Sequence, residues 1–270
     1  MNTVNFPGLG IYLKLNRVAF SIGTREVYWY GLIIVAGILL AIVFGIYEAR
    51  RAGLPKDSVV DTAIVAIPVG IICARLYFVF WNWSYYAQKP LEILNFRGGG
   101  LAIYGGIIGG TAAGYIYCRI KKMDYQKMFD VGAFGFLIGQ AVGRWGNFVN
   151  AEAYGIQTRV PWRMEVFNNE MNSLISVHPT FLYESLWNII GFIGLYLYRT
   201  KKKFEGEIFL LYVAWYGIGR AWIEQLRADS LPYSATFKIS QIVAALTAIA
   251  ALFIIAIKRK KLKKEEEPSV

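Results

Sequence analysis

The sequence predicts an all-α polytopic membrane protein, and two observations carry this prediction. Of the 270 residues, 56% are hydrophobic and only 17% are charged, and the mean hydropathy is +0.40. Soluble domains contain about a quarter charged residues. The charges gather in short clusters such as Lys201–Lys203, and apolar stretches of bilayer-spanning length, about 20 residues, lie between the clusters. The same composition excludes a disordered chain and a disulfide scaffold.

Seven apolar stretches are expected to cross the membrane as helices, because backbone in lipid must satisfy its own hydrogen bonds. The predicted spans cover residues 30–48, 61–81, 99–119, 127–144, 180–198, 207–226 and 238–257. Connecting segments rich in Lys and Arg alternate with segments that have few, and the chain end after Lys258 is strongly basic. The positive-inside rule therefore places the C-terminus in the cytoplasm, and seven spans place the N-terminus outside.

This topology makes residues 1–257 a single transmembrane domain, followed by a charged cytoplasmic tail over 258–270. The sizeable extracytoplasmic segments are about 1–29 and 145–179. The formal net charge is +11, but the basic residues lie at the ends of the spans. That position indicates membrane topology, and no nucleic-acid partner is expected.

Cysteine and histidine are too few for a typical zinc or iron–sulfur site. Cys73 and Cys118 both lie inside apolar stretches, where a thiol usually acts as a small hydrophobe. His178 is the one histidine, and we expect a structural role for it at the start of a loop with proline. No acidic cluster suggests a carboxylate-bound metal. We therefore expect no metal and no cofactor.

Charged residues at membrane depth are costly and indicate function or pairing. The candidates are Asp61, Arg75, Asp130, Arg144, Glu184, Arg220 and Glu224. Arg220 and Glu224 are four residues apart on one predicted helix, with Tyr216 one turn before them and Arg227 beyond. This stripe is either an intrahelical ion pair or the wall of a polar pocket.

Residues 98–114 contain eight glycines. Glycines four residues apart let helices approach closely, which is one interpretation of the block. At its start, Gly98, Gly99 and Gly100 lie beside Arg97 at the predicted outer interface, where bare backbone amides can receive an anionic headgroup. Both interpretations stay open.

The densest group of polar residues is the segment Gly143–Gly155, GRWGNFVNAEAYG, where the fourth span leaves the membrane. Arg144 offers a two-donor fork to a phosphate. Asn147 and Asn150 can add hydrogen bonds, and Glu152 can accept a proton or orient the arginine. The alternative is a glycine-broken helix end with solvated polar residues.

This segment resembles the signature of bacterial prolipoprotein diacylglyceryl transferases. Further segments resemble that family in the same order: Tyr28–Gly31, Gly100–Gly106, His178–Glu184, Tyr216–Arg220 with Glu224 and Arg227, and Ser240–Gln241. The resemblance covers about residues 25–245, nearly the whole predicted membrane domain.

The resemblance implies a transferase of lipoprotein biosynthesis in the bacterial cytoplasmic (inner) membrane, with its active site on the extracytoplasmic side. Such an enzyme moves the diacylglyceryl group of phosphatidylglycerol to the lipobox cysteine of a prolipoprotein signal peptide. A thioether forms, and glycerol-1-phosphate leaves. The expected partners are thus phosphatidylglycerol, prolipoprotein signal peptides and the bilayer. Because the substrate brings the thiol, Cys73 and Cys118 can stay inert.

The resemblance also assigns the site residues. Its implied catalytic set is Arg144, Arg220, Tyr30, Tyr104, Glu152 and Glu224. Its implied phosphatidylglycerol-binding set is Arg144, Asn147, Asn150, Tyr216, Arg220, Gly99 and Gly100. Many relatives have a histidine at the position of Tyr104, so the identity of the proton acceptor stays open here.

Two other functions also fit part of the pattern. A small transporter or channel would equally use intramembrane charges and glycine-rich helices, although no inverted repeat is visible. A metal-dependent phospholipid headgroup transferase would need an acidic Mg²⁺ cluster, which the sequence does not show. Resistance of the activity to EDTA separates the predicted enzyme from the metal-dependent class.

Overall fold

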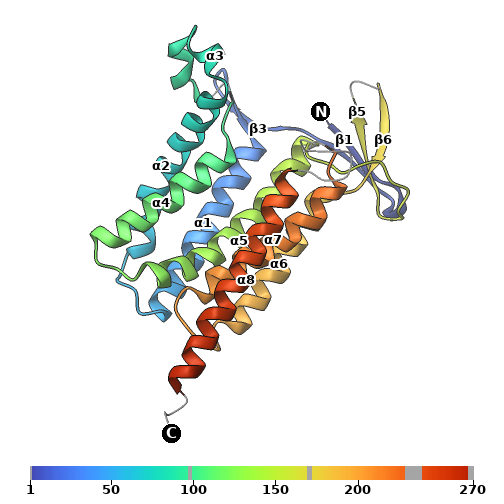
Figure 1. The fold of residues 1–270 in the computed structure, drawn as a ribbon. Coiled ribbons are helices and arrows are strands. Elements are labelled where there is room, and N and C mark those ends of the chain that lie inside the picture. Colours follow the sequence, from blue (N-terminus) through green and yellow to red (C-terminus); the bar gives the residue numbers. More distant parts are fainter. Residues whose placement is uncertain (1, 97–98, 169–171, 229–238, 267–270) are drawn as a thin grey trace. The chain divides into compact units, whose positions relative to one another are not determined.

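A computed structural model describes residues 2–96, 99–168, 172–228 and 239–266 (Figure 1). Within these ranges, each of the seven predicted spans overlaps one long helix. The helices are α1 (Trp29–Arg51), α2 (Ser58–Trp81), α4 (Ile103–Ile120), α5 (Tyr125–Asn150), α6 (Thr180–Tyr198), α7 (Glu207–Ile223) and α8 (Ile239–Glu266). Short helical turns, α3 (Trp83–Tyr86), η1 (Pro7–Leu9), η2 (Pro90–Leu94) and η4 (Glu224–Leu226), lie between or beside them.

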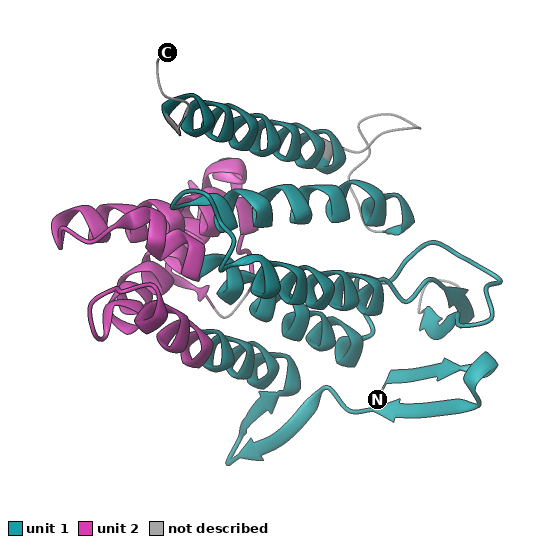
Figure 2. Cartoon of the chain, turned by 90° about the horizontal axis from the view of Figure 1, so that it is seen from below, with its two compact units in different colours: residues 1–41, 132–270 teal, residues 42–131 magenta. Residues whose placement is uncertain are grey.

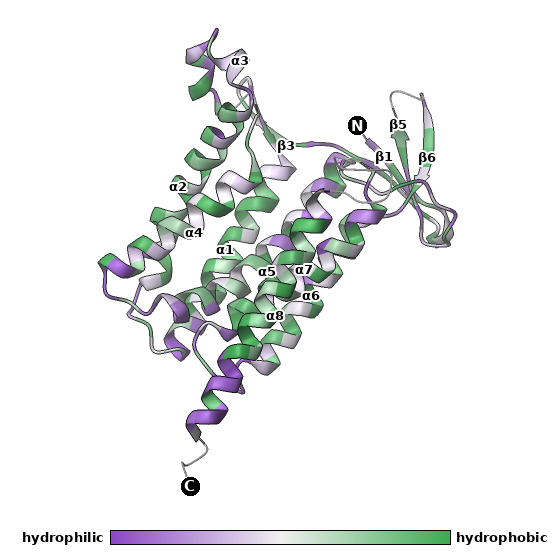
Figure 3. Ribbon diagram, in the orientation of Figure 1, coloured by the Kyte–Doolittle hydropathy of each residue, from purple (hydrophilic) through white to green (hydrophobic). Residues whose placement is uncertain are grey.

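Three of these helices are long and apolar enough to cross a membrane. They are Trp29–Arg51, Ser58–Trp81 and the stretch Ser240–Glu265 of α8, with hydropathies of 2.5, 2.2 and 2.4. Only 11% of the most apolar window of α1 is buried, so its hydrophobic side chains face outward, as lipid contact requires. In Figure 3 the colouring by hydropathy shows that hydrophobic residues predominate along these helices and that the C-terminal end of α8 is hydrophilic. For the other four helices, crossing of the membrane stays a prediction.

The prediction of an all-α fold is wrong outside the helices, where the described residues also form two small sheets. One sheet has the strand order β2-β1-β5-β6, from Ile11–Leu15, Asn2–Phe6, Met164–Asn168 and Ser173–Val177. The other pairs β3 (Val18–Ile22) with β4 (Arg25–Tyr28). Open sheet edges are tolerated outside lipid, so short alternating segments there form strands. The larger sheet joins the two segments that were expected on the same side of the membrane.

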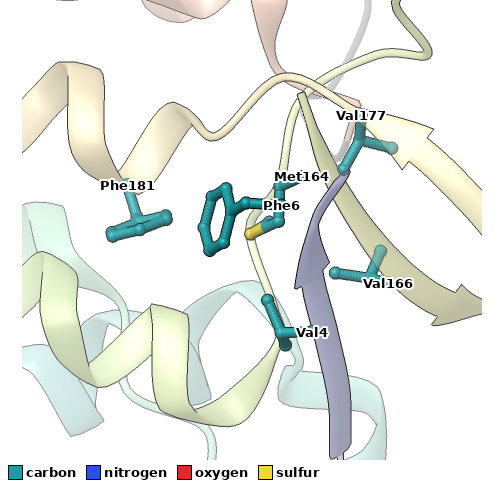
Figure 4. Close-up of a cluster of buried hydrophobic side chains, with 6 residues drawn as sticks. All are labelled: Val4, Phe6, Met164, Val166, Val177 and Phe181. Atoms are coloured by element: carbon teal, nitrogen blue, oxygen red, sulfur yellow. The ribbon is translucent and has the colours of Figure 1, made fainter. Parts of the chain in front are cut away.

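A hydrophobic cluster attaches the larger sheet to the ends of two helices (Figure 4). Its buried members are Val4, Phe6, Met164, Val166, Val177 and Phe181. Phe148 near the end of α5 stacks on Phe181 of α6, with ring centroids 4.6 Å apart. The sheet therefore fixes the C-terminal end of α5, where the GRWGNFVNAEAYG segment lies.

The chain forms two compact units, residues 1–41 with 132–270 and residues 42–131 (Figure 2). In the second unit α2 and α4 pack through glycines. A Cβ added at Gly105 would lie 2.4 Å from the carbonyl oxygen of Cys73, and one added at Gly109 would lie 2.3 Å from the Cys73 Cβ. The close-packing interpretation of the glycine block is confirmed at these two positions.

In the first unit, paired tryptophans join α6 and α7. The rings of Trp187 and Trp215 stack at 4.2 Å, and each indole N–H donates to the other residue's backbone carbonyl at 3.0 Å. Gly191 and Gly219 leave the space these rings fill, because an added Cβ would lie 2.3 Å and 2.1 Å from an indole nitrogen. This seam holds the helices that carry the charged residues described next.

Candidate active site

Glu184 is the centre of a buried charge cluster in the first unit. Its carboxylate lies 2.5 Å from Arg144 Nη2, 3.0 Å from Arg227 Nη1 and 3.6 Å from Arg220 Nη1. The side chain of Glu184 is only 6% exposed. One carboxylate therefore holds guanidinium groups from α5, α7 and the turn after α7.

Glu224 provides a second carboxylate to the same cluster. Arg220 Nη2 lies 2.7 Å from Glu224 Oε2, so the predicted ion pair between residues four apart is confirmed. The Ser240 hydroxyl at the start of α8 donates to Glu224 Oε1 at 2.7 Å, and the Arg227 Nε lies 4.0 Å from Oε2. Arg220 also reaches Glu184, so the ion pair is part of a larger charge cluster, and a polar pocket along this helix stays a prediction.

Backbone hydrogen bonds join the three segments that carry the cluster, which are the end of α5, the start of α6 and the end of α7. The Ile156 N–H donates to the Leu226 carbonyl at 2.7 Å, and the Gly155 N–H donates to the His178 carbonyl at 2.9 Å. A Cβ at Gly155 would lie 2.6 Å from both the His178 Cβ and the Leu226 oxygen, so only glycine fits. The segment after α5 therefore joins the start of α6 to the end of α7.

The predicted phosphate-binding segment continues α5 instead of breaking it. The helix runs to Asn150 and ends where Ala151 takes a left-handed conformation, φ 51°. Arg144 Nη1 donates to Asn147 Oδ1 at 3.3 Å, and Asn147 Nδ2 donates to Glu152 Oε1 at 2.9 Å. The side chain of Asn147 therefore links Glu152 to Arg144 through two hydrogen bonds.

The other predicted residues of the first unit lie around this segment. Tyr30, at the start of α1, packs over Gly146, where an added Cβ would lie 2.8 Å from its ring. Asn150 accepts a hydrogen bond from Arg17 through its backbone oxygen, at 2.9 Å. Tyr216 lies one turn before Arg220 on α7 and stacks on Tyr212 at 6.1 Å.

Tyr104, Gly99 and Gly100 belong to the second unit, so their placement at the cluster stays a prediction. Arg97 and Gly98 lie outside the described residues. The third predicted span begins at residue 99, but α4 begins only at Ile103. Gly99 and Gly100 have φ values of 83° and 78°, a left-handed conformation that a helix cannot contain.

His178 has the contacts of a structural residue. Its Nδ1 lies 3.1 Å from the Tyr183 hydroxyl, which also accepts a hydrogen bond from the Trp162 indole at 2.7 Å. Burial lowers the pKa of His178 below its ordinary value, which favours the neutral ring at neutral pH. Cys118 is buried and Cys73 partly buried, and neither forms a disulfide.

Glu184 and Arg227 have larger roles in the structure than the sequence assigned to them. The sequence marked Glu184 as an intramembrane charge and Arg227 as the end of a stripe, but neither entered the predicted site. The available signal was the position of Glu184 in the HPTFLYE segment. Its three arginine contacts depend on helix packing, which residue spacing does not encode.

An apolar cavity of about 380 Å³ lies between α1, α5 and α6 in the same unit. Its lining includes Ala36, Ala141, Ile189 and the pair Trp145 and Ser185. The Trp145 indole donates to the Ser185 hydroxyl at 3.2 Å. These two residues directly follow Arg144 and Glu184, so the cavity adjoins the same α5–α6 seam as the charge cluster.

Within the part of the chain that the structure describes, the cluster is rich in arginine: Arg144, Arg220 and Arg227 surround the buried Glu184 and Glu224. The side chains of Arg144 and Arg220 are 22% and 21% exposed, whereas that of Glu224 is 3% exposed. Such a cluster keeps guanidinium donors available to an anion while the carboxylates hold them in place.

The apolar helices define an integral membrane protein, and its first unit contains a cluster of arginines and glutamates. A family model for prolipoprotein diacylglyceryl transferase matches residues 17–257. The chain belongs to this family.

Curated relatives agree along nearly the whole chain. A phosphatidylglycerol–prolipoprotein diacylglyceryl transferase of Clostridioides difficile is 50% identical over 217 residues, which are 80% of this chain and 85% of the relative. Proteins with the same name from Bacillus cytotoxicus and Lysinibacillus sphaericus are 42% and 43% identical. Those two alignments cover 93% and 94% of this chain and 95% and 96% of the relatives.

Proposed function

We propose that the protein transfers the sn-1,2-diacylglyceryl group of phosphatidylglycerol to the thiol of a lipobox cysteine in a prolipoprotein. The cysteine sulfur loses its proton and forms a C–S bond to the glyceryl carbon. The bond between that carbon and the phosphate oxygen breaks, and glycerol-1-phosphate leaves with the electron pair. The arginine cluster around Glu184 carries this proposal, together with the family membership.

The reaction adds negative charge to a phosphate as it leaves, so fixed cations stabilise the transition state more than the ground state. We assign this role to Arg144 and Arg220, whose side chains are more exposed than that of Arg227. Asn147 and Glu152 orient Arg144, and Glu224 orients Arg220, through the contacts described above.

The remaining residues complete the lipid site. Asn150, Tyr216, Gly99 and Gly100 bind the phosphatidylglycerol headgroup. Tyr30 and Tyr104 position the lipid or share protons. The protein functions in the bacterial cytoplasmic membrane as one catalytic domain over residues 1–257. Its N-terminus and site face outward, where lipobox peptides arrive, and residues 258–270 form the cytoplasmic tail.

The apolar cavity accommodates one acyl chain of the lipid. Its volume is within the range of small-molecule sites, and Trp145 and Ser185 connect it to the arginine cluster. Ala36→Phe would fill it from α1, so turnover with long-chain phosphatidylglycerol should fall more than turnover with a short-chain lipid. Leu39→Phe, at an exposed position of the same helix outside the cavity lining, is the matched control. Equal turnover of both lipids in Ala36→Phe would contradict this placement.

The direct test of the function uses purified protein, phosphatidylglycerol and a synthetic lipobox peptide, followed by the mass of the peptide. We expect the mass to rise by one diacylglyceryl group, with and without EDTA. A peptide with serine in place of the lipobox cysteine should stay unmodified. An unchanged mass of the cysteine peptide, with protein that is folded and lipid-bound, would refute the proposal.

A further inference from the structure

Two amide side chains lie one helical turn from the arginine cluster, in the same unit. Gln140 on α5 is four residues before Arg144, and Asn188 on α6 is four residues after Glu184. Residues four apart lie on the same face of a helix, about 6 Å along its axis. Each amide therefore shares a helix face with a member of the cluster, and neither belongs to the site residues assigned above.

Contacts between α5 and α6 place the two amides at the same level. The Ser185 hydroxyl donates to the Ala141 carbonyl at 2.9 Å, and the ring centroids of Phe192 and Phe134 lie 5.7 Å apart. The two helices are therefore antiparallel. Each amide lies between these two contacts along its own helix, so both belong to one layer of the helix bundle.

Both amides have one polar atom that is buried and unpaired. Asn188 is 3% exposed, and its Nδ2 donates to the Glu184 carbonyl at 2.8 Å, but no described residue donates to its Oδ1. Gln140 Nε2 donates to the Tyr212 hydroxyl of α7 at 2.9 Å, and among the described residues its buried Oε1 likewise has no donor. A buried polar atom without a hydrogen bond is costly and rare. The layer therefore offers two acceptors to a molecule that carries hydrogen-bond donors.

Phosphatidylglycerol carries matching donors in one place only. Its two esters and its phosphate diester offer acceptors, whereas the headgroup glycerol has two hydroxyls. The three carbons of glycerol are long enough to reach across one helical turn, about 5 Å. A phosphate at Arg144 and Arg220 would thus leave the hydroxyls within reach of both amides. An ethanolamine headgroup also has donors, but its ammonium would lie beside the guanidinium groups, which repel it.

We propose that Gln140 and Asn188 accept hydrogen bonds from the two hydroxyls of the headgroup glycerol and so select a lipid with a polyol headgroup. The inference rests on the proposed function and adds two binding residues to the headgroup site. In this arrangement the phosphate lies at the arginines, and the glycerol points into the layer between α5, α6 and α7.

The test combines two variants with two lipids. Asn188→Leu and Gln140→Met nearly keep the size of the side chain but remove the acceptor. Phosphatidylpropanol has the diacylglyceryl group and the phosphate diester of phosphatidylglycerol but no headgroup hydroxyl. Ser58→Ala is the matched control, because Ser58 Oγ is also buried without a partner among the described residues, yet it belongs to the second unit and is not a residue of the proposed site. Native mass spectrometry in detergent measures the binding of each lipid, and thioether formation gives kcat and KM.

We expect the wild type to bind phosphatidylglycerol roughly a hundredfold more tightly than phosphatidylpropanol, about tenfold for each hydrogen bond. Asn188→Leu and Gln140→Met should each weaken the binding of phosphatidylglycerol roughly tenfold and leave the binding of phosphatidylpropanol unchanged. The KM values for the two lipids should change in the same way. Ser58→Ala should discriminate between the lipids as the wild type does.

Equal binding of the two lipids by the wild type would overturn the inference, and this comparison does not depend on the folding of any variant. Equal losses for both lipids in the two variants would also overturn it, because the amides would then serve the fold or hold a water molecule. If the expected binding differences are seen but no lipobox peptide is modified, the glycerol site stands and the proposed transfer reaction fails.

Discussion

Glu184→Gln is the substitution that tests the arginine cluster most directly. The amide has nearly the same shape as the carboxylate but no charge. It would remove the ion pair of Arg144 and leave Glu224 in contact with Arg220 and Arg227. We expect the guanidinium groups to move apart and to lose the orientation that binds the leaving phosphate.

The contact distances allow the size of this effect to be estimated. A charge pair at about 3 Å is worth roughly 5–6 kcal/mol at an effective dielectric constant of about 20, before desolvation. Removal of one partner from a buried pair costs about 3–5 kcal/mol in measured cases. If about half of that loss falls on transition-state binding, roughly 1.5–2.5 kcal/mol, the rate falls by about one to two decades.

The assay is thioether formation on a lipobox peptide at saturating phosphatidylglycerol, normalised to folded protein. Glu48→Gln is the matched control, because Glu48 is also buried and pairs with Arg51 but lies outside the proposed site. The control should keep its kcat even where it loses stability. Wild-type turnover by well-folded Glu184→Gln would refute the idea that this carboxylate holds the arginines for catalysis.

Three further predictions concern single roles in the reaction. Arg144→Lys and Arg220→Lys should each lower the transfer rate by about one to two decades while the protein still inserts into the membrane, because lysine lacks the two-donor fork. Near wild-type turnover of either variant would contradict the phosphate assignment. Replacement of both Cys73 and Cys118 by alanine should leave transfer intact, and a diacylglyceryl adduct on either cysteine would disprove a substrate-borne nucleophile. Tyr104→Phe should lower the transfer rate less than either arginine variant, since it removes one neutral hydrogen bond worth about 0.5–1.5 kcal/mol. Complete loss of turnover would identify Tyr104 as a proton carrier.

The positions of the helices were predictable because a helix that crosses a bilayer needs about 20 consecutive, mostly apolar residues. Apolar stretches of sufficient length predicted every long helix of the described residues. The ends were less predictable, since Gly99 and Gly100 delay the start of α4 until Ile103. The strands were missed because five-residue segments outside lipid have no comparable signal, and β1 pairs with β5 across more than half of the chain.

The site was predictable where its residues share one segment or one helix. Arg220 and Glu224 follow from helical spacing, and Arg144 from a dense polar segment. Glu184 joins them because α6 packs against both α5 and α7. The Ser185–Ala141 hydrogen bond links it to α5, and the Trp187–Trp215 pair links it to α7. A long-range contact of this kind leaves no periodicity in the sequence.

The two buried carboxylates explain how an arginine cluster can exist before its substrate arrives. Three guanidinium groups alone would repel one another and adopt many conformations. Glu184 and Glu224 offset this repulsion and fix the side chains, so the cost of ordering them is met during folding. A phosphate bound to these guanidinium groups would be stabilised more strongly as it gains negative charge on leaving. Weakening the carboxylates should therefore lower kcat more than it lowers lipid affinity.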